Sequence, residues 1–175
     1  TINRIKKSQE EKEQQLSSRY KALINNMPII YFQKQLLKDK DGRIINSKIL
    51  DVNHAFEEYL GIDKEDIIGK ELDMLQMRYP QLKFINKQNI GTNKSIIIPN
   101  QNNEKRYFDK MMFPGIEEGV VDVFCIDKTD SHKILLHAED HLRSLESILD
   151  NLPIAAKVKD VNDDFKYVFW NKKAE

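Results

Sequence analysis

The chain has 175 residues, of which 40% are hydrophobic and 32% charged, as is typical of a globular protein. Its 28 basic and 28 acidic residues cancel, so no net field draws it to nucleic acid or to an anionic membrane. No apolar run approaches the roughly 18 residues of a membrane helix, and a single cysteine cannot form an internal disulfide. We therefore expect a cytoplasmic fragment without membrane or nucleic-acid contacts, although its parent protein could be membrane-attached.

Residues 1–24 are rich in Lys, Glu and Gln and lack Gly and Pro, a composition that predicts one long helix. An apolar stripe develops only late in this helix, at Leu16, Tyr20 and Leu23, before Pro28 ends it. We therefore expect an amphipathic helix whose first turns are solvated or packed against a partner helix.

β-prone runs and turns alternate after this helix. Residues 29–37 and 43–52 flank an Asp41–Gly42 pair, which predicts an antiparallel hairpin. Three further β-prone runs cover residues 94–99, 105–113 and 119–127. Pro80 opens a predicted helix that extends to residue 89. The last β-prone run is apolar on both of its faces, which predicts that both sides of the sheet are covered.

The sequence ILDVNHAFEEYLGIDKEDIIGK at residues 49–70 joins a strand to two short helices. Asn53 is a candidate N-cap for the first helix, and Gly61 is placed to end it. Asp63 then caps a second helical turn, which Gly69 closes. A strand therefore ends and a helix begins at Asn53, in the stretch around which the rest of the chain is organised.

This order resembles that of PAS sensor domains, and the resemblance extends over residues 25–130. NMPIIYF, which ends at Phe32, resembles the entry to the first strand of that family, and CIDKTD at residues 125–130 resembles its terminal Asp-x-Thr signature, with Lys128 in place of the more usual apolar residue. The resemblance implies an α+β PAS fold: a five-stranded antiparallel sheet with short helices on one face, flanked by N-terminal and C-terminal helices.

The most regular periodicity follows Thr129. An apolar seam with spacings of three and four residues comprises Leu135, Ala138, Leu142, Leu145, Leu149 and Leu152. This spacing is typical of the a and d positions of a coiled coil. Because an isolated helix of this length is marginal in water, we predict a homodimer that pairs through this linker and through the N-terminal helices.

The chain also repeats itself. The segment around Pro28 recurs around Pro153, at an offset of 125 residues, and LDVN at 50–53 is echoed by VFWN at 168–171. Repeats at a fixed period indicate an array of domains. The predicted divisions are an N-terminal amphipathic helix (1–24), a PAS domain (25–130), a coiled-coil linker helix (131–152) and the truncated start of a second PAS domain (153–175).

Four residues invite a chemical reading. His137 and His141 have the spacing of a helical metal pair, but the Glu of a zinc protease helix and a third ligand are absent. His132 lacks the sequence that follows the phosphoacceptor histidine of sensor kinases. Cys125 would be inert if its apolar strand buries it. We therefore predict no catalytic residue and no metal site in this fragment.

The resemblance implies a pocket between the sheet and the segment that begins at Pro80. Its candidate lining residues are Phe84, Ile85, Gln88, Ile97, Phe108, Met112 and Phe124. Their apolar composition fits a small-molecule site and a filled core equally well. The flavin-type Cys helix is missing and the segment after Pro80 has no His, which argues against flavin and haem. No cofactor is predicted.

The PAS resemblance implies a sensory or regulatory module. We expect the module to belong to a two-component signalling protein, a sensor histidine kinase. In the expected relay, Asp127 pairs with a Lys or Arg and Thr129 caps the linker helix, so that the last strand is coupled to the linker. One alternative is a ligand-free dimerisation spacer. Another is the PAS region of a transcription factor or a nucleotide cyclase, which would differ only beyond Glu175.

Overall fold

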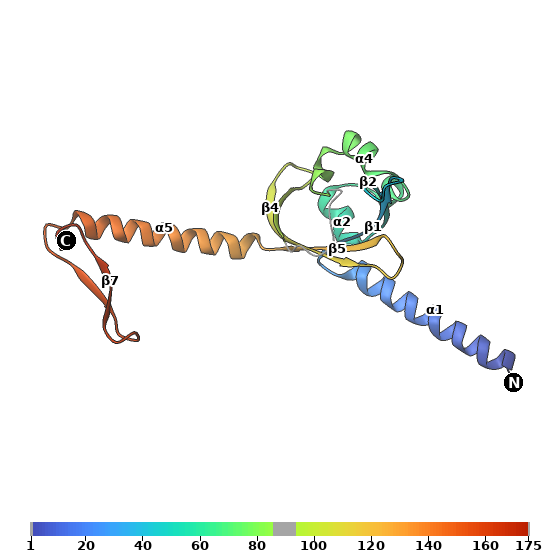
Figure 1. Cartoon of the computed structure of the whole chain (residues 1–175), viewed down its shortest axis with the longest axis horizontal. Helices are drawn as coiled ribbons and strands as arrows, with labels where there is room; N and C mark the ends of the chain where they lie inside the picture. The colour runs from blue at the N-terminus through green and yellow to red at the C-terminus, as the bar shows by residue number, and fades with distance from the viewer. Residues whose placement is uncertain (1, 86–93, 175) are drawn as a thin grey trace. The chain divides into compact units, whose positions relative to one another are not determined.

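The computed structural model describes residues 2–85 and 94–174. The chain divides into two compact units, Thr1–Thr129 and Asp130–Glu175, which we describe separately (Figure 1). No described helix is both long enough and apolar enough to cross a membrane.

The first unit begins with helix α1 (Ile2–Asn26). The predicted apolar stripe at Leu16, Tyr20 and Leu23 is exposed, whereas Ile24 in the last turn is buried against the rest of the unit. The helix ends where Pro28 would remove a backbone donor and clash with the preceding turn. Only its last turns therefore belong to the hydrophobic core.

Five strands form one antiparallel sheet in the order β2-β1-β5-β4-β3. The strands are β1 (Ile30–Lys38), β2 (Ile44–Val52), β3 (Lys94–Pro99), β4 (Lys105–Pro114) and β5 (Val120–Asp127). The predicted α+β fold with a five-stranded antiparallel sheet and flanking helices is confirmed. Since β5 lies in the middle of the sheet, it is apolar on both faces.

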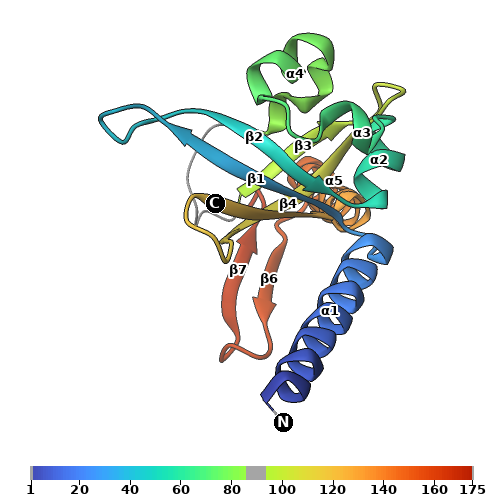
Figure 2. The same cartoon turned by 90° about the vertical axis from the view of Figure 1, so that its right-hand side faces the viewer.

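Four short helical segments lie between β2 and β3, on one side of the sheet (Figure 2). They are α2 (His54–Leu60), α3 (Lys64–Ile67), α4 (Leu72–Arg78) and the 3-10 helix η1 (Pro80–Phe84). The predicted caps of α2 are confirmed: Asn53 is its N-cap, and Gly61 is its C-cap with a φ of 64°. Such a left-handed backbone favours glycine.

The helix predicted for residues 80–89 is shorter and of a different type. It is a 3-10 helix that ends at Phe84, and the remainder of the predicted helix lies outside the described residues from residue 86 onward. The side-chain amide of Gln76 in α4 donates to the carbonyl oxygens of Leu82 (3.1 Å) and Ile85 (2.7 Å). These bonds occupy carbonyls that a continuing α-helix would use for its own next turn.

The hydrophobic core lies between the sheet and these short helices. Phe32 of β1 contacts the rings of Phe56 and Phe84 edge-on, at centroid distances of 5.8 and 5.9 Å. On the opposite face, the ring of Tyr31 contacts that of Phe124, while Phe113 remains half exposed. The two faces of the sheet are therefore covered to different extents.

Strands β2 and β3 form the edges of the sheet. Strand β3 begins with Lys94 and ends with Pro99, and the pairing of β2 with β1 is interrupted by two register shifts. Charged residues, proline and irregular pairing are features that protect an exposed edge from pairing with another strand.

The second unit contains most of helix α5 (Thr129–Asn151) and the antiparallel strands β6 (Lys157–Asp160) and β7 (Lys166–Trp170). Helix α5 has no buried side chain, and Leu142 and Leu145 are 60% and 56% exposed. A two-stranded hairpin alone is marginally stable, because it can bury little apolar surface.

Candidate functional site

Part of the predicted pocket comes together on the helix-covered face of the sheet. Phe84 of η1 packs against the core, and Ile85, Phe108 and Met112 are buried within it. Ile85, Phe108 and Met112 fill the space between the sheet and η1, whereas Phe84 also lines a groove at the edge of the sheet.

The other predicted pocket residues lie elsewhere. Phe124 is on the opposite face of the sheet, because neighbouring residues of a strand point in opposite directions and its neighbours in β5 take the core side. Ile97 lies on edge strand β3 and is 48% exposed, and it lines the groove at the edge of the sheet together with Phe84. Gln88 lies outside the described residues.

Two lysines on the core-facing side of the sheet were not predicted as site residues. Lys34 of β1 is 1% exposed and Lys110 of β4 is 4% exposed, and Lys110 Nζ donates to the carbonyl oxygen of Phe84 at 3.3 Å. Burial and, to a smaller extent, the charge of Lys110 lower the pKa of Lys34 to about 8. Burial also lowers the pKa of Lys110, and the positive charge of Lys94 acts in the same direction. The core therefore holds like charges close together.

We expect Lys34→Met to raise the free energy of unfolding at pH 7 by about 1–3 kcal/mol, because it removes a desolvated charge that Lys110 repels. The unfolded chain, in which lysine has its ordinary pKa of 10.5, binds more protons than the folded chain between pH 8 and 10.5. The stability of the unsubstituted protein should accordingly rise with pH across this window. Urea unfolding checks both statements, with exposed Lys38→Met on the same strand as control. A loss of stability in Lys34→Met would contradict them.

Cys125 is fully buried in β5, and burial raises the pKa of its thiol to about 12. The thiolate is the nucleophilic form of cysteine, so we expect iodoacetamide not to modify the folded protein at pH 8. Mass spectrometry should show modification only after denaturation, whereas an added cysteine at exposed Ser144 should react at once. Rapid modification of Cys125 in the folded protein would show that β5 opens readily.

The end of β5 is tied to β4 and to the first residue of α5. Asp127 Oδ1 accepts the backbone N–H of Thr129 at 2.8 Å, and its other oxygen lies 3.4 Å from Arg106 Nη1. Thr129 Oγ1 accepts the backbone N–H of Tyr107 at 3.1 Å, so the hydroxyl connects the first residue of α5 to β4. Partial burial raises the pKa of Asp127, but the bonds from Thr129 and Arg106 outweigh it, and the net shift is downward.

A second connection, which we call the first joint, centres on the buried side chain of Asn53. Its Nδ2 donates to the carbonyl oxygens of Ile24 (3.1 Å) and Ile29 (2.7 Å). Its Oδ1 accepts the backbone N–H groups of Tyr31 (3.0 Å) and Phe56 (3.1 Å). One amide thus fixes the last turns of α1, the start of β1 and the start of α2.

The second unit contains the same arrangement around Asn171, which we call the second joint. Asn171 Nδ2 donates to the carbonyl oxygens of Leu149 (2.8 Å) and Ile154 (2.9 Å), and its Oδ1 accepts the N–H of Ala156 at 2.8 Å. These three partners lie 125 residues after the corresponding partners of Asn53. Asn171 is fully buried although most of its unit is exposed.

The two joints also match at the helix ends. Asn25 Oδ1 accepts the backbone N–H of His54 at 3.1 Å, and Asp150 Oδ1 accepts that of Lys172 at 3.1 Å. The internal repeat of the sequence therefore has a physical basis, because the repeated residues make the same hydrogen bonds. Helix α5 enters the second unit as α1 enters the first. The sequence pattern indicated the repeat but not the role of the two asparagines.

A family model described as "PAS domain" matches residues 18–91, from the later turns of α1 past η1. This match includes the first joint and the first two strands. The five-stranded antiparallel sheet with its flanking helices is a PAS-like fold. A search of curated proteins found no match.

Several solved structures are similar to this chain. The PAS domain of an HTR-like protein from Haloarcula marismortui has 20% sequence identity and a TM-score of 0.43, with 69% of this chain and 98% of that chain covered. The PAS domain of BvgS from Bordetella pertussis has 15% identity and a TM-score of 0.40, with 73% and 98% covered. An RNA-binding Light-Oxygen-Voltage receptor has 12% identity and a TM-score of 0.45, with 73% and 38% covered.

Proposed function

We propose that residues 25–130 are the sensory or regulatory module of a two-component signalling protein, with a sensor histidine kinase as its parent. The module itself catalyses no reaction. A ligand or protein partner changes the packing of the sheet, and the change passes from the end of β5 through Asp127 and Thr129 into α5. The match of residues 18–91 to the PAS domain family supports the sensory part of this proposal.

The repeated joint is the observation that carries the proposal. A helix that serves only as a tether needs no fixed attachment, yet the amides of Asn53 and Asn171 each hold a helix end to the strand that follows it. With such rigid attachments, a small movement of a strand displaces the helix as well, whereas a flexible loop would absorb the movement.

The partner that we propose for α5 is a second copy of the chain. Leu135, Leu142 and Leu145 at seam positions are exposed, and the three-and-four spacing of the seam matches that of a parallel coiled coil, in which the same face of each copy packs on the other. The exposed stripe of α1 extends this dimer on the N-terminal side. Burying both stripes would remove apolar surface that the single chain leaves in water.

Two measurements test the proposal. Sedimentation equilibrium of the purified chain should show a monomer–dimer equilibrium. Spin labels at Ser144→Cys should then report a distance between the two α5 helices that changes when a ligand binds to the first unit. A dimer whose helix spacing is insensitive to every bound ligand would contradict the relay.

The alternative of a ligand-free spacer is favoured by one observation: Ile85, Phe108 and Met112 fill the predicted pocket. Native mass spectrometry separates the two functions. A retained small molecule, or a thermal shift with a metabolite, supports sensing. Repeatedly empty spectra without any thermal shift favour a spacer that only holds the helices in register.

A further inference from the structure

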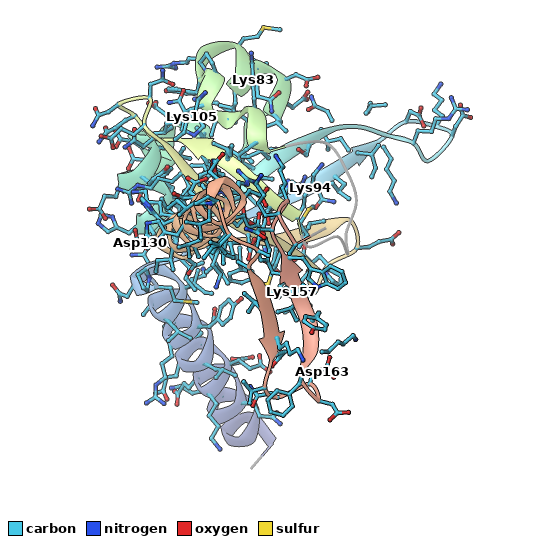
Figure 3. The ribbon with its side chains drawn as sticks, turned by 90° about the vertical axis from the view of Figure 1, so that its left-hand side faces the viewer. Lys83, Lys94, Lys105, Asp130, Lys157 and Asp163 are labelled. Carbon is cyan, nitrogen blue, oxygen red and sulfur yellow. The ribbon has the colours of Figure 1, made fainter. Side chains whose placement is uncertain are left out.

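A groove of about 510 Å³ lies between η1 and the edge of the sheet at β3. Its apolar walls come from Phe84, Ile96 and two prolines, and three lysines, Lys83, Lys94 and Lys110, line it as well. None of the described residues that line this groove is acidic. Figure 3 labels Lys83 on η1 and Lys94 at the start of β3.

Two of these lysines bring like charges close together. Lys94 and Lys110 are directly opposite each other on β3 and β4. Like charges at directly opposed positions of an antiparallel pair repel and destabilise the sheet. Lys110 is also almost completely buried, and the charge of Lys34 lies close to it in the core.

We propose that this groove binds a small organic anion, with a carboxylate or phosphate group between Lys94 and Lys110 and an apolar body against Phe84 and Ile96. A bound anion converts the repulsion between the two ammonium groups into two attractions, and hydrogen bonds between charged groups are stronger than neutral ones. The groove volume lies within the roughly 300–1,000 Å³ of small-molecule sites. Lys83 also lines a neighbouring groove with Asp73, so we assign the anionic group to the other two lysines.

Isothermal titration calorimetry of the whole chain with benzoate and with phenyl phosphate tests this inference, at constant ionic strength and with chloride as the reference anion. At least one probe should bind saturably, and the tighter one identifies a carboxylate or a phosphate as the preferred group. Removal of the apolar body, as in acetate or inorganic phosphate, should weaken the binding.

Lys110→Met and Lys94→Gln should each weaken the binding by about tenfold or more, since each removes one charge-assisted contact. The matched control is Lys105→Met, which removes an exposed lysine of the same strand that does not line the groove (Figure 3). This variant should bind within about twofold of the unsubstituted chain. The absence of saturable binding for both probes, or an equal loss in the Lys105 variant, would overturn the inference.

This inference deepens the proposed function by naming a ligand class, but the two can fail separately. Lysine-dependent binding that leaves the spin-label distance between the α5 helices unchanged would support the anion site and contradict the relay. A distance that responds to another ligand, without anion binding at these lysines, would support the relay and contradict the site.

Discussion

Asn53→Ala is expected to lower the free energy of unfolding of the first unit by about 3–5 kcal/mol, a loss large enough to unfold many domains. The substitution leaves the N–H groups of Tyr31 and Phe56 and the carbonyl groups of Ile24 and Ile29 without their side-chain partner. An unsatisfied buried polar group costs about 1–3 kcal/mol, and partial access to water reduces the sum. Hydrogen exchange at Tyr31 and Phe56, together with urea unfolding, measures the loss.

Three variants give this prediction its controls. Asn26→Ala removes an exposed amide that bonds only within α1, and it should change the stability by less than about 0.5 kcal/mol. Asn53→Asp keeps the acceptor oxygen but sets a buried carboxylate oxygen against the carbonyl oxygens of Ile24 and Ile29, so it should destabilise the unit at least as much as Asn53→Ala. Asn171→Ala should destabilise only the second unit, which the single tryptophan, Trp170, reports by fluorescence. Equal stability of Asn53→Ala and Asn26→Ala would contradict the role of the joint.

Leu142→Asp is expected to abolish dimerisation through α5, with the dissociation constant rising by about 100-fold or more. In the proposed dimer Leu142 packs against its counterpart at the centre of the seam, where two carboxylates would be desolvated and would repel each other. In the single chain the same side chain is 60% exposed, so the substitution should leave the folding of each unit unchanged. Sedimentation equilibrium measures the dissociation constant, and circular dichroism checks the fold.

The matched control for this variant is Ser144→Asp, which introduces the same charge on the same helix outside the seam. The dissociation constant of its dimer should be nearly the same as that of the unsubstituted chain. A Leu142→Asp chain that remains dimeric would show that the seam is not the interface, and Leu16→Asp in α1 would then test the other exposed stripe.

Local patterns predicted most of the fold. Alternating apolar residues marked the strands, and the caps at Asn53 and Gly61 are correct because a cap depends on residues within one turn of the chain. The apolar character of β5 predicted that both faces of the sheet are covered. Val123 and Cys125 are buried on the core side, whereas Phe124 on the other face is half-buried. The match between the repeated sequences also has a structural counterpart, the two joints.

The remaining features depend on contacts that are distant in the sequence. The segment after Pro80 has a helical pattern, but the side chain of Gln76 takes the carbonyls that would continue an α-helix. Phe124 belongs to an apolar run, but the sequence does not show which face of the sheet its side chain lies on. Lysine is among the residues least often buried, so the sequence carries no signal that Lys34 and Lys110 lie in the core.

The two edges of the sheet restrict how this protein can associate. Strand β3 has lysine and proline at its ends, and the pairing along β2 is irregular. Neither edge strand therefore offers another polypeptide a continuous row of hydrogen-bonding groups. Concentrated solutions should therefore resist fibril formation. Association through the proposed dimer should be reversible by dilution, since its helix surfaces would separate without unfolding.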